Sequence, residues 1–175
     1  MDKRGALAEL VALVPAPRQP DFGELSWKQV FQVLGHGLPA DYIAFAEVYG
    51  RVCFNHELIV EDLRRLSPER LRQDRLYSNV LRVGATACGT YLAWLTEGNP
   101  DRWPVADTDF AGYLNGPDEP DTDLRPWAHV PLTRFLLEQF TTDEYWLEEP
   151  PTAFTPAEIW QRAHPAGDPA DNPFL

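Results

Sequence analysis

Apolar and polar positions follow two different rhythms along this chain of 175 residues. In the first and last parts, apolar residues recur three and four positions apart, which is typical of helices that bury one face. In the middle part, short apolar stretches alternate with polar residues between turn signals, which is typical of strands. The pattern therefore predicts helices, then a run of strands, then helices again.

Capping residues indicate where several of these helices begin and end. Ser26 precedes an apolar face as an N-cap, and Thr155 stands three residues before Glu158 in the form of a capping box. Gly50 is placed to end a helix in the left-handed conformation. The sequence Ser67-Pro68-Glu69 is typical of a helix start. The predicted helices cover residues 6–14, 27–34, 39–49, 131–140, a short stretch within 61–75 and a short stretch after Thr155.

The middle part of the chain predicts a sheet. Leu92 and Trp94 share one face of an extended segment, and Tyr91 and Ala93 share the other. Trp94 and Trp103 are the strongest candidates for the core. The predicted strands cover residues 52–60, 80–87, 91–95 and 103–106, and residues 107–126, rich in Asp, Gly and Pro, are expected to form a loop.

Helices that flank a run of strands indicate an α+β fold, with a largely antiparallel sheet and helices packed mainly on one face. We expect an N-terminal helix and proline-rich linker over residues 1–25 and the main α+β domain over residues 26–150. Residues 151–175 are expected to form a short helix and a tail on the same domain, with the tail from residue 168 partly disordered.

Three features predict a cytoplasmic protein. The chain holds no run of eighteen apolar residues, so no transmembrane helix is expected, and Glu9 interrupts the apolar run near the N-terminus, which argues against a secretory signal. The two cysteines, Cys53 and Cys88, form no CxxC pair and are expected to be buried thiols in a reducing compartment. Whether they form a disulfide stays open, because their separation in space cannot be read from the sequence.

The net charge of −12 is concentrated in one third of the chain. Residues 1–96 carry 11 acidic and 11 basic groups, whereas residues 97–149 carry 13 acidic and three basic groups, a net charge of −10. A field of this sign repels nucleic acid and anionic membranes and attracts basic partners. Solubility alone is the alternative explanation, since many cytoplasmic proteins are acidic.

No catalytic or cofactor-binding motif is recognisable in the sequence. The four histidines are scattered without metal-binding spacing, and there is no GxSxG, P-loop or GxGxxG motif. Cys53 and His56 would lie on opposite faces of one strand, which argues against a nucleophile–base pair. The alternate carboxylates of residues 118–123 lack the glycine and the final glutamate of a calcium loop. We therefore expect no catalytic residue, no metal and no cofactor.

Carboxylates that alternate with aromatic rings suggest a surface for binding a protein. Aromatic side chains serve as desolvated anchors and cation–π faces, while carboxylates steer association and pair with Lys or Arg. The alternative, equally weighted, is that Tyr145, Trp146 and Leu147 pack into the core. The candidate partner-binding residues are Asp118, Glu119, Asp121, Asp123, Trp127, Asp143, Glu144, Tyr145, Trp146, Glu148 and Glu149.

Three segments, spread over about two thirds of the chain, together resemble the SUKH superfamily. The first is Leu38-Pro39-Ala40-Asp41-Tyr42 at a helix start, with Tyr49-Gly50 at the end of the same helix. The second is Trp94-Leu95-Thr96-Glu97-Gly98-Asn99-Pro100-Asp101-Arg102-Trp103-Pro104, which is similar to a central hairpin. The third is Val130-Pro131-Leu132-Thr133-Arg134-Phe135-Leu136-Leu137, which is similar to the entry of a C-terminal helix. Residues 61–82 and 107–126 depart from the shorter family pattern.

The resemblance implies an α+β fold without enzymatic activity or cofactor, and the role of a bacterial immunity protein that binds and blocks a toxin. We therefore expect a cytoplasmic antitoxin for a basic, nucleic-acid-targeting toxin, with neither nucleic acid nor a membrane as its own partner. An interaction or regulatory module of the same fold without a toxin partner is the alternative, and a hydrolase with an unrecognised site is a third. No binding residue transfers from the family, and the oligomeric state stays open.

Overall fold

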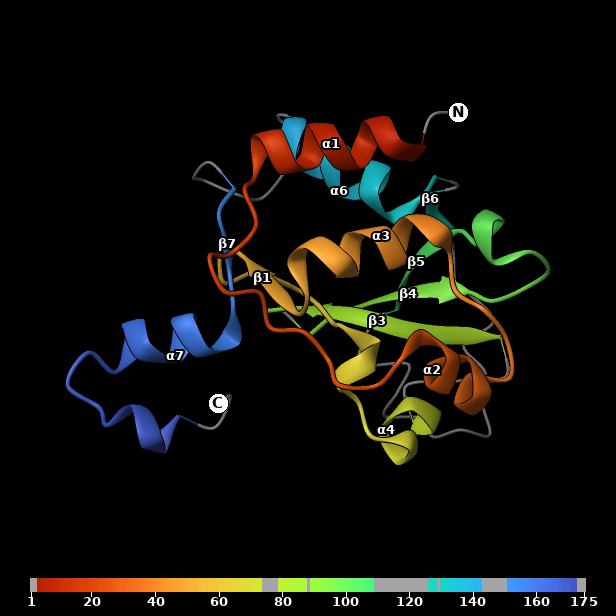
Figure 1. Ribbon diagram of the computed structural model, residues 1–175. Helices are drawn as coiled ribbons and strands as arrows, with labels where there is room; N and C mark the ends of the chain where they lie inside the picture. Colours follow the sequence, from red (N-terminus) through yellow and green to blue (C-terminus); the bar gives the residue numbers. More distant parts are fainter. Residues whose placement is uncertain are drawn as a thin grey trace.

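The computed structural model describes residues 3–73, 79–87, 89–108, 126–128, 130–142 and 151–172. Within these residues, seven strands form one sheet in the order β6-β5-β4-β3-β2-β1-β7, and every neighbouring pair is antiparallel (Figure 1). The strands are β1 (Val52–Phe54), β2 (Leu58–Val60), β3 (Val80–Thr86), β4 (Tyr91–Leu95), β5 (Val105–Thr108), β6 (Pro126–Ala128) and β7 (Ala153–Phe154).

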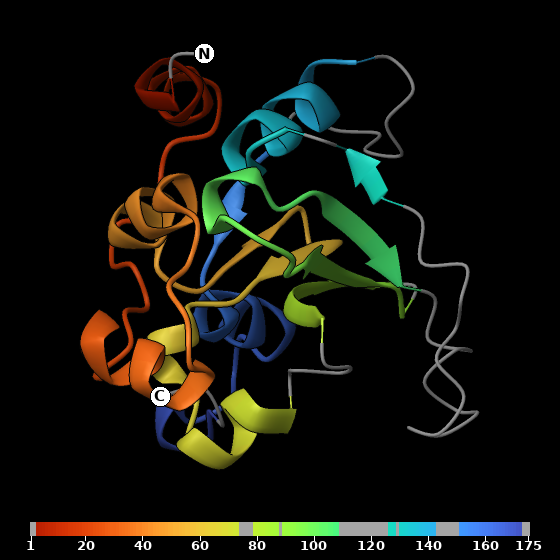
Figure 2. The same ribbon diagram turned by 90° about the vertical axis from the view of Figure 1, so that its right-hand side faces the viewer.

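Three helices form a layer beside the sheet. Helices α1 (Lys3–Leu13), α3 (Ala40–Tyr49) and α6 (Leu132–Thr141) contact one another, and Figure 2 views α1 nearly end-on with α3 and α6 next to it. Helices α2 (Trp27–Leu34) and α4 (Pro68–Gln73) pack against each other, while α7 (Pro156–Ala163) follows β7. The α+β prediction with an antiparallel sheet is confirmed, whereas packing of the helices mainly on one face stays a prediction. Three short 3-10 helices complete the described elements: η1 (Leu63–Arg65), η2 (Pro100–Arg102) and η3 (Pro169–Asp171).

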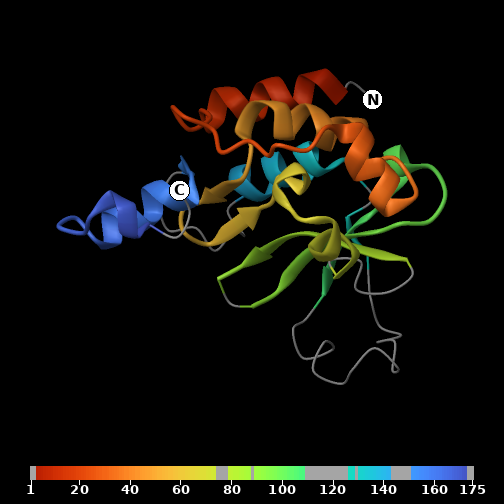
Figure 3. The same cartoon turned by 60° about the horizontal axis from the view of Figure 1, so that its bottom comes forward.

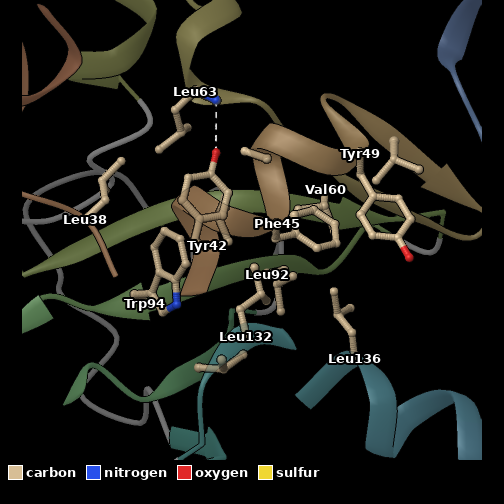
Figure 4. Close-up of a cluster of buried hydrophobic side chains, with 14 of the residues drawn as sticks. Leu38, Tyr42, Phe45, Tyr49, Val60, Leu63, Leu92, Trp94, Leu132 and Leu136 are labelled. Carbon is tan, nitrogen blue, oxygen red and sulfur yellow. Dashed lines mark hydrogen bonds between the residues drawn. The ribbon is translucent and has the colours of Figure 1, made fainter. Parts of the chain in front are cut away.

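One hydrophobic core joins the sheet to this helix layer. Figure 4 shows Leu92 and Trp94 from β4 in the same cluster as Phe45 from α3 and Leu136 from α6. Trp94 and Trp103 are 1% and 5% exposed, which confirms both as core residues. The core also includes Leu10, from α1, and Val14, so the N-terminal residues contribute to the same apolar cluster as the strands.

Tyr42 places a polar group inside this core without leaving it unsatisfied. Its ring meets the Trp94 ring edge-on, with centroids 5.0 Å apart. Its hydroxyl donates to the Glu61 carbonyl oxygen at 2.7 Å and accepts from the Leu63 backbone N–H at 3.0 Å, the bond drawn in Figure 4. Because both roles of the hydroxyl are filled, the ring can be fully buried and still fix the chain between β2 and η1.

Carboxylates from distant positions hold the N-termini of α3 and α6. Asp101 Oδ1, in η2, accepts from the Ala40 backbone N–H at 2.8 Å. Asp41 Oδ2, in α3, accepts from the Thr133 backbone N–H at 3.1 Å and from the Thr133 hydroxyl at 3.4 Å. Each helix begins after a proline that makes no side-chain cap, so these carboxylates take the capping role. The β4–β5 connection is thereby tied to α3, and α3 to α6.

The expected local caps are confirmed at two helices. Ser26 forms a capping box with Gln29 at the start of α2, and Thr155 forms one with Glu158 at the start of α7. Gly35 ends α2 in the left-handed conformation, with φ +79°. These signals are readable in the sequence because each depends on residues no more than four positions apart.

Gly50 does not end α3 in the expected left-handed conformation. Its φ is +60°, but its ψ is −147°, outside the left-handed helical region. A Cβ at this position would lie 2.6 Å from the Asp21 backbone oxygen, which also accepts from the Arg51 backbone N–H at 2.9 Å. Glycine is needed because the chain turns from α3 towards β1 against the backbone of residue 21.

The predicted strand over residues 52–60 is wrong, because the segment is a hairpin of β1 and β2. Asn55 and His56 both have positive φ, +49° and +65°, and the Glu57 N–H donates to the Phe54 carbonyl at 2.9 Å. This is the conformation of a type I′ turn, for which Asn is a favoured residue. Cys53 lies in β1 and His56 lies in the turn, so the expectation that they share one strand is also wrong.

The shortest strands were not predicted correctly, because they are too short to show an alternating pattern. Strand β5 continues to Thr108 and β6 begins at Pro126, so the loop expected over residues 107–126 is wrong at both ends, and residues 109–125 lie outside the described residues. The two-residue strand β7 was not predicted, and within the tail that was expected to be partly disordered, residues 169–171 form η3 while residues 173–175 lie outside the described residues. Two or three residues are too few to establish a period of two.

Truncation of Trp94 tests its role in the core. We expect Trp94→Ala to lower the free energy of unfolding by about 3–5 kcal/mol, because it removes a fully buried ring from between β4 and α3. Phe22→Ala is the matched control, since Phe22 is 46% exposed and its loss is expected to cost about 0.5 kcal/mol or less. Urea denaturation measures both values, and a Trp94→Ala value as small as that of Phe22→Ala would contradict the packing.

Substitution of Asp41 tests the long-range cap. We expect Asp41→Ala to cost about 1–3 kcal/mol, because the Thr133 N–H loses its acceptor at a buried position. Asp41→Asn keeps an oxygen acceptor and is expected to recover part of that loss. Equal stability of both variants and the parent chain in urea denaturation would show that this contact does not hold α6.

Candidate functional site

Most of the predicted partner-binding residues lie outside the part of the chain that the structure describes. Ten of the eleven fall within residues 109–125 and 143–150. Trp127 is placed by its backbone in β6, at one edge of the sheet, and its side chain is not described. The structure therefore shows only where the segments 109–125 and 143–150 are attached to the fold, through the described residues that flank them.

The segment 109–125 leaves the sheet at an end that the strand register identifies. It follows Thr108, the last residue of β5, which pairs with Tyr91, the first residue of β4. Tyr91 pairs with Ala85 near the end of β3, and Ala85 pairs with Ile59, the middle residue of β2. Thr108 thus lies in the same row across the sheet as Ile59, one residue from the start of β2.

The segment 143–150 is attached at the same end. It lies between α6 and β7, and Ala153 in β7 pairs with Phe54, which pairs in turn with Leu58 at the start of β2. The Phe140 ring, near the C-terminus of α6, lies 4.9 Å from the Phe54 ring, so the helix also ends here. Thr108 and Ala153 thus lie in adjacent rows of the register at the same end of the sheet, and we call this end the acidic end of the sheet.

The two attachment points are close enough to share a partner. They are separated by five strand spacings, or about 24 Å across the sheet. The segment 109–125 carries five acidic residues and one basic residue, and the segment 143–150 carries four acidic residues and no basic one. Two connections with most of the net charge of the protein therefore depart from one end of the sheet, which sequence reasoning did not predict because it depends on register.

The most concentrated group of charges among the described residues is internally paired. Arg64 forms a two-point contact with buried Asp62, through Nε–Oδ1 at 3.0 Å and Nη2–Oδ2 at 2.8 Å. Its Nη1 lies 3.0 Å from Glu47 Oε1, and its guanidinium stacks 4.5 Å from the Trp27 ring centre. Asp62 Oδ2 also accepts from the Gly23 N–H at 2.9 Å. These contacts fix residues 21–25 against η1 and α3, which is a structural role.

Asp21 extends this group. Its side chain pairs with Arg65, while Arg51 Nε lies 2.9 Å from Glu61 Oε2. Burial raises the pKa of Asp21, and the Arg65 and Arg51 charges offset this rise only in part. The sequence indicated a charged, Arg-rich stretch here but gave no sign of its partners, because the Arg65–Asp21 pair joins residues 44 positions apart.

The described histidines contact backbone oxygens and aromatic rings. His36 Nδ1 lies 2.8 Å from the Gly37 carbonyl oxygen, and its ring meets Trp103 edge-on at 5.0 Å. His164 Nδ1 lies 3.0 Å from the Trp160 carbonyl oxygen, and the His56 ring lies 5.3 Å from Phe154. Among the residues that the structure describes, no group of three His, Cys, Asp or Glu side chains could hold a metal ion.

The thiol of Cys53 is shielded from solvent. Cys53 is buried in β1, and burial raises the pKa of its thiol to about 11, so the thiolate is scarce at neutral pH. Cys88 lies outside the described residues, so its distance from Cys53 is not defined.

None of the described helices has the length and apolar character needed to cross a membrane.

Comparisons with known proteins gave no match: none was found among family models, among curated proteins or among solved structures.

The reactivity of the Cys53 thiol tests whether this side chain is buried. In a Cys88→Ser variant, we expect the folded protein to react with a disulfide reagent at pH 8 on the order of 100-fold more slowly than in urea, because Cys53 is buried and protonated. The rate of the folded protein should rise as the pH approaches 11. Equal rates in the presence and absence of urea would contradict the burial of this thiol.

Proposed function

We propose that this chain is a non-enzymatic immunity protein of the SUKH superfamily, which binds and neutralises a basic, nucleic-acid-targeting toxin. The observation that carries the proposal is the charge at the acidic end of the sheet. The segments attached there, 109–125 and 143–150, together hold nine acidic residues and one basic residue. Because their attachment points lie at the same end of the sheet, the two segments can contact the same partner.

The sign and density of this charge support a basic partner. A protein that binds nucleic acid presents Lys and Arg to phosphate groups, so a dense set of carboxylates can occupy the same site and displace the substrate. Electrostatic attraction of this kind speeds association and depends strongly on salt. The aromatic residues within or next to these segments, Trp127, Tyr145 and Trp146, would add desolvated contacts.

The residues that carry the family resemblance have structural roles in this fold. Tyr42, Trp94 and Trp103 are buried, and Asp41 and Asp101 hold helix N-termini. These positions therefore support the scaffold, which favours partner contacts elsewhere. The segment 109–125 lies within a stretch that departs from the family pattern, as expected for a surface that must suit one particular partner.

A tagged pull-down from the source cells, at low and moderate salt, tests the proposal. We expect one basic protein to be captured at low salt and to elute as salt rises, because surface charge pairs are screened. The active site of that protein would then identify the reaction that is inhibited. Capture of several wall-synthesis or signalling proteins, or of no basic protein, would contradict the toxin proposal and favour a regulatory module.

Charge-reversal variants locate the contact on the captured protein. We expect Glu144→Lys with Glu148→Lys to weaken binding about tenfold or more at low salt and to reduce its salt dependence. Glu9→Lys with Glu24→Lys makes the same change in net charge at exposed positions of the N-terminal region and is expected to have a much smaller effect. Equal effects of the two pairs in titration calorimetry would show that net charge alone, rather than this surface, determines affinity.

A further inference from the structure

Residues 21–25 connect the proline-rich linker to α2, and we call them the strap. Figure 1 and Figure 3 both show the chain between α1 and α2 running past η1, which is drawn in yellow. The Arg51 N–H donates to the Asp21 carbonyl oxygen at 2.9 Å, and the Leu25 N–H donates to the Arg64 carbonyl oxygen at 3.1 Å. These backbone bonds attach the strap to the start of the sheet and to η1, so exchange of their hydrogens reports on its attachment.

The strap lies on a cluster of charges in which carboxylates outnumber guanidinium groups. The ion pairs among the described residues are Asp21–Arg65, Glu61–Arg51, Asp62–Arg64 and Glu47–Arg64. Four carboxylates therefore share three arginines, and these seven groups carry one negative charge in excess. A nearby like charge disfavours ionisation of a carboxyl group, so such a cluster favours the uptake of one proton.

Asp21 is the carboxylate in this cluster that is least well satisfied. Its Oδ2 atom is buried and has no hydrogen-bond donor among the described residues, although the side chain as a whole is 19% exposed. In contrast, Asp62 accepts two hydrogen bonds at each oxygen, from Arg64 and from the Gly23 N–H. Glu47 is 54% exposed to water. Because an ionised oxygen that is buried without a donor is costly, the excess proton is expected at Asp21.

The groups that face Asp21 determine how its charge affects the strap. Burial has the largest effect and raises the pKa of Asp21, and the neighbouring Asp62 charge raises it further. The charges of Arg65 and Arg51 lower this pKa, but only in part. Asp21 therefore binds a proton more tightly when the strap is in place than when it is released. By linkage, attachment of the strap strengthens as the pH falls from neutrality and weakens as the pH rises through this pKa.

We propose that Asp21 is a proton-operated latch, which holds the strap on Arg51 and η1 more tightly in weak acid than at neutral pH. The device acts on the strap and not on α1. Leu10 and Val14 belong to the core, and the Tyr49 hydroxyl donates to the Val14 carbonyl oxygen at 2.6 Å, so these contacts do not depend on Asp21. The inference is independent of the proposed function, because it concerns the chain without a partner.

Amide hydrogen exchange followed by NMR on the full chain tests the latch. We expect the protection factor of the Arg51 N–H, corrected for the intrinsic exchange rate at each pH, to rise about two- to fivefold from pH 7 to pH 5. The Val14 N–H, which donates to the Leu10 carbonyl oxygen in α1, should keep its protection. Protection of Arg51 that does not change with pH would overturn the proposal.

Substitution of Asp21 separates its titration from that of its neighbours. Asp21→Asn is neutral at every pH, so its Arg51 N–H should already be better protected than that of the parent chain at pH 7 and should no longer respond to pH. Glu24→Gln removes the same charge from an exposed position of the strap and should keep the pH response of the parent chain. An Asp21→Asn variant with the pH response of the parent chain, or with lower protection at pH 7, would overturn the latch.

Arg65→Gln distinguishes a latch from a contact that is merely structural. Because the Arg65 charge lowers the pKa of Asp21, its loss should move the rise in Arg51 protection to higher pH. A structural ion pair predicts weaker attachment at every pH with no such displacement, and that result would contradict the proposal. The carboxyl carbon of Asp21, followed by NMR in the parent chain, provides a measurement that needs no variant. A titration midpoint no higher than the usual value for aspartate would overturn the latch and leave the proposed function standing.

Discussion

Two carboxylates at helix N-termini, the buried Asp41 and the exposed Asp101, fix the arrangement on which the other elements depend. Asp101 binds the first N–H of α3, and Asp41 binds the N–H and hydroxyl of Thr133 at the start of α6. A carboxylate at a helix N-terminus satisfies unpaired donors and interacts favourably with the helix dipole. Because each contact joins different elements, it orients them as well as stabilising each helix. The turn after β4, α3 and α6 therefore form one connected unit around Trp94.

Local signals in the sequence predicted much of this scaffold. The capping sequences at Ser26 and Thr155 and the apolar spacing of the helices depend on near neighbours, so they could be read directly. The central tryptophans were recognisable because large rings between turn signals favour burial. The β1–β2 turn was hidden within an apolar stretch, and β7 is too short to have a pattern.

Contacts between distant positions could not be predicted in the same way. Asp41 and Thr133 are 92 positions apart, and Gly23 and Asp62 are 39 apart. A single sequence shows that each residue is charged or polar but gives no sign of its partner. The acidic end of the sheet illustrates the same limit, since the composition of its two segments was evident while their common attachment depends on register. The candidate surface itself stays a prediction, because ten of its eleven residues lie outside the described residues.

The residues that carry the SUKH resemblance and the residues that carry the excess charge lie in different parts of the chain. The former are buried or hold helix N-termini, while the latter lie on connections attached at the acidic end of the sheet. Such a division allows connections to change with the partner while the core is kept.

Amide hydrogen exchange at Ala40 and Thr133 tests the central claim most directly, because N–H groups in the first turn of a helix usually lack partners and exchange quickly. If carboxylates from other elements hold both helix ends, both amides should exchange far more slowly than unpartnered N–H groups in the first turn of a helix, and the buried Thr133 amide should exchange more slowly than the exposed Ala40 amide. Exchange of either amide at the rate of an unprotected helix end would contradict the account, since α3 would then not be fixed to its neighbours.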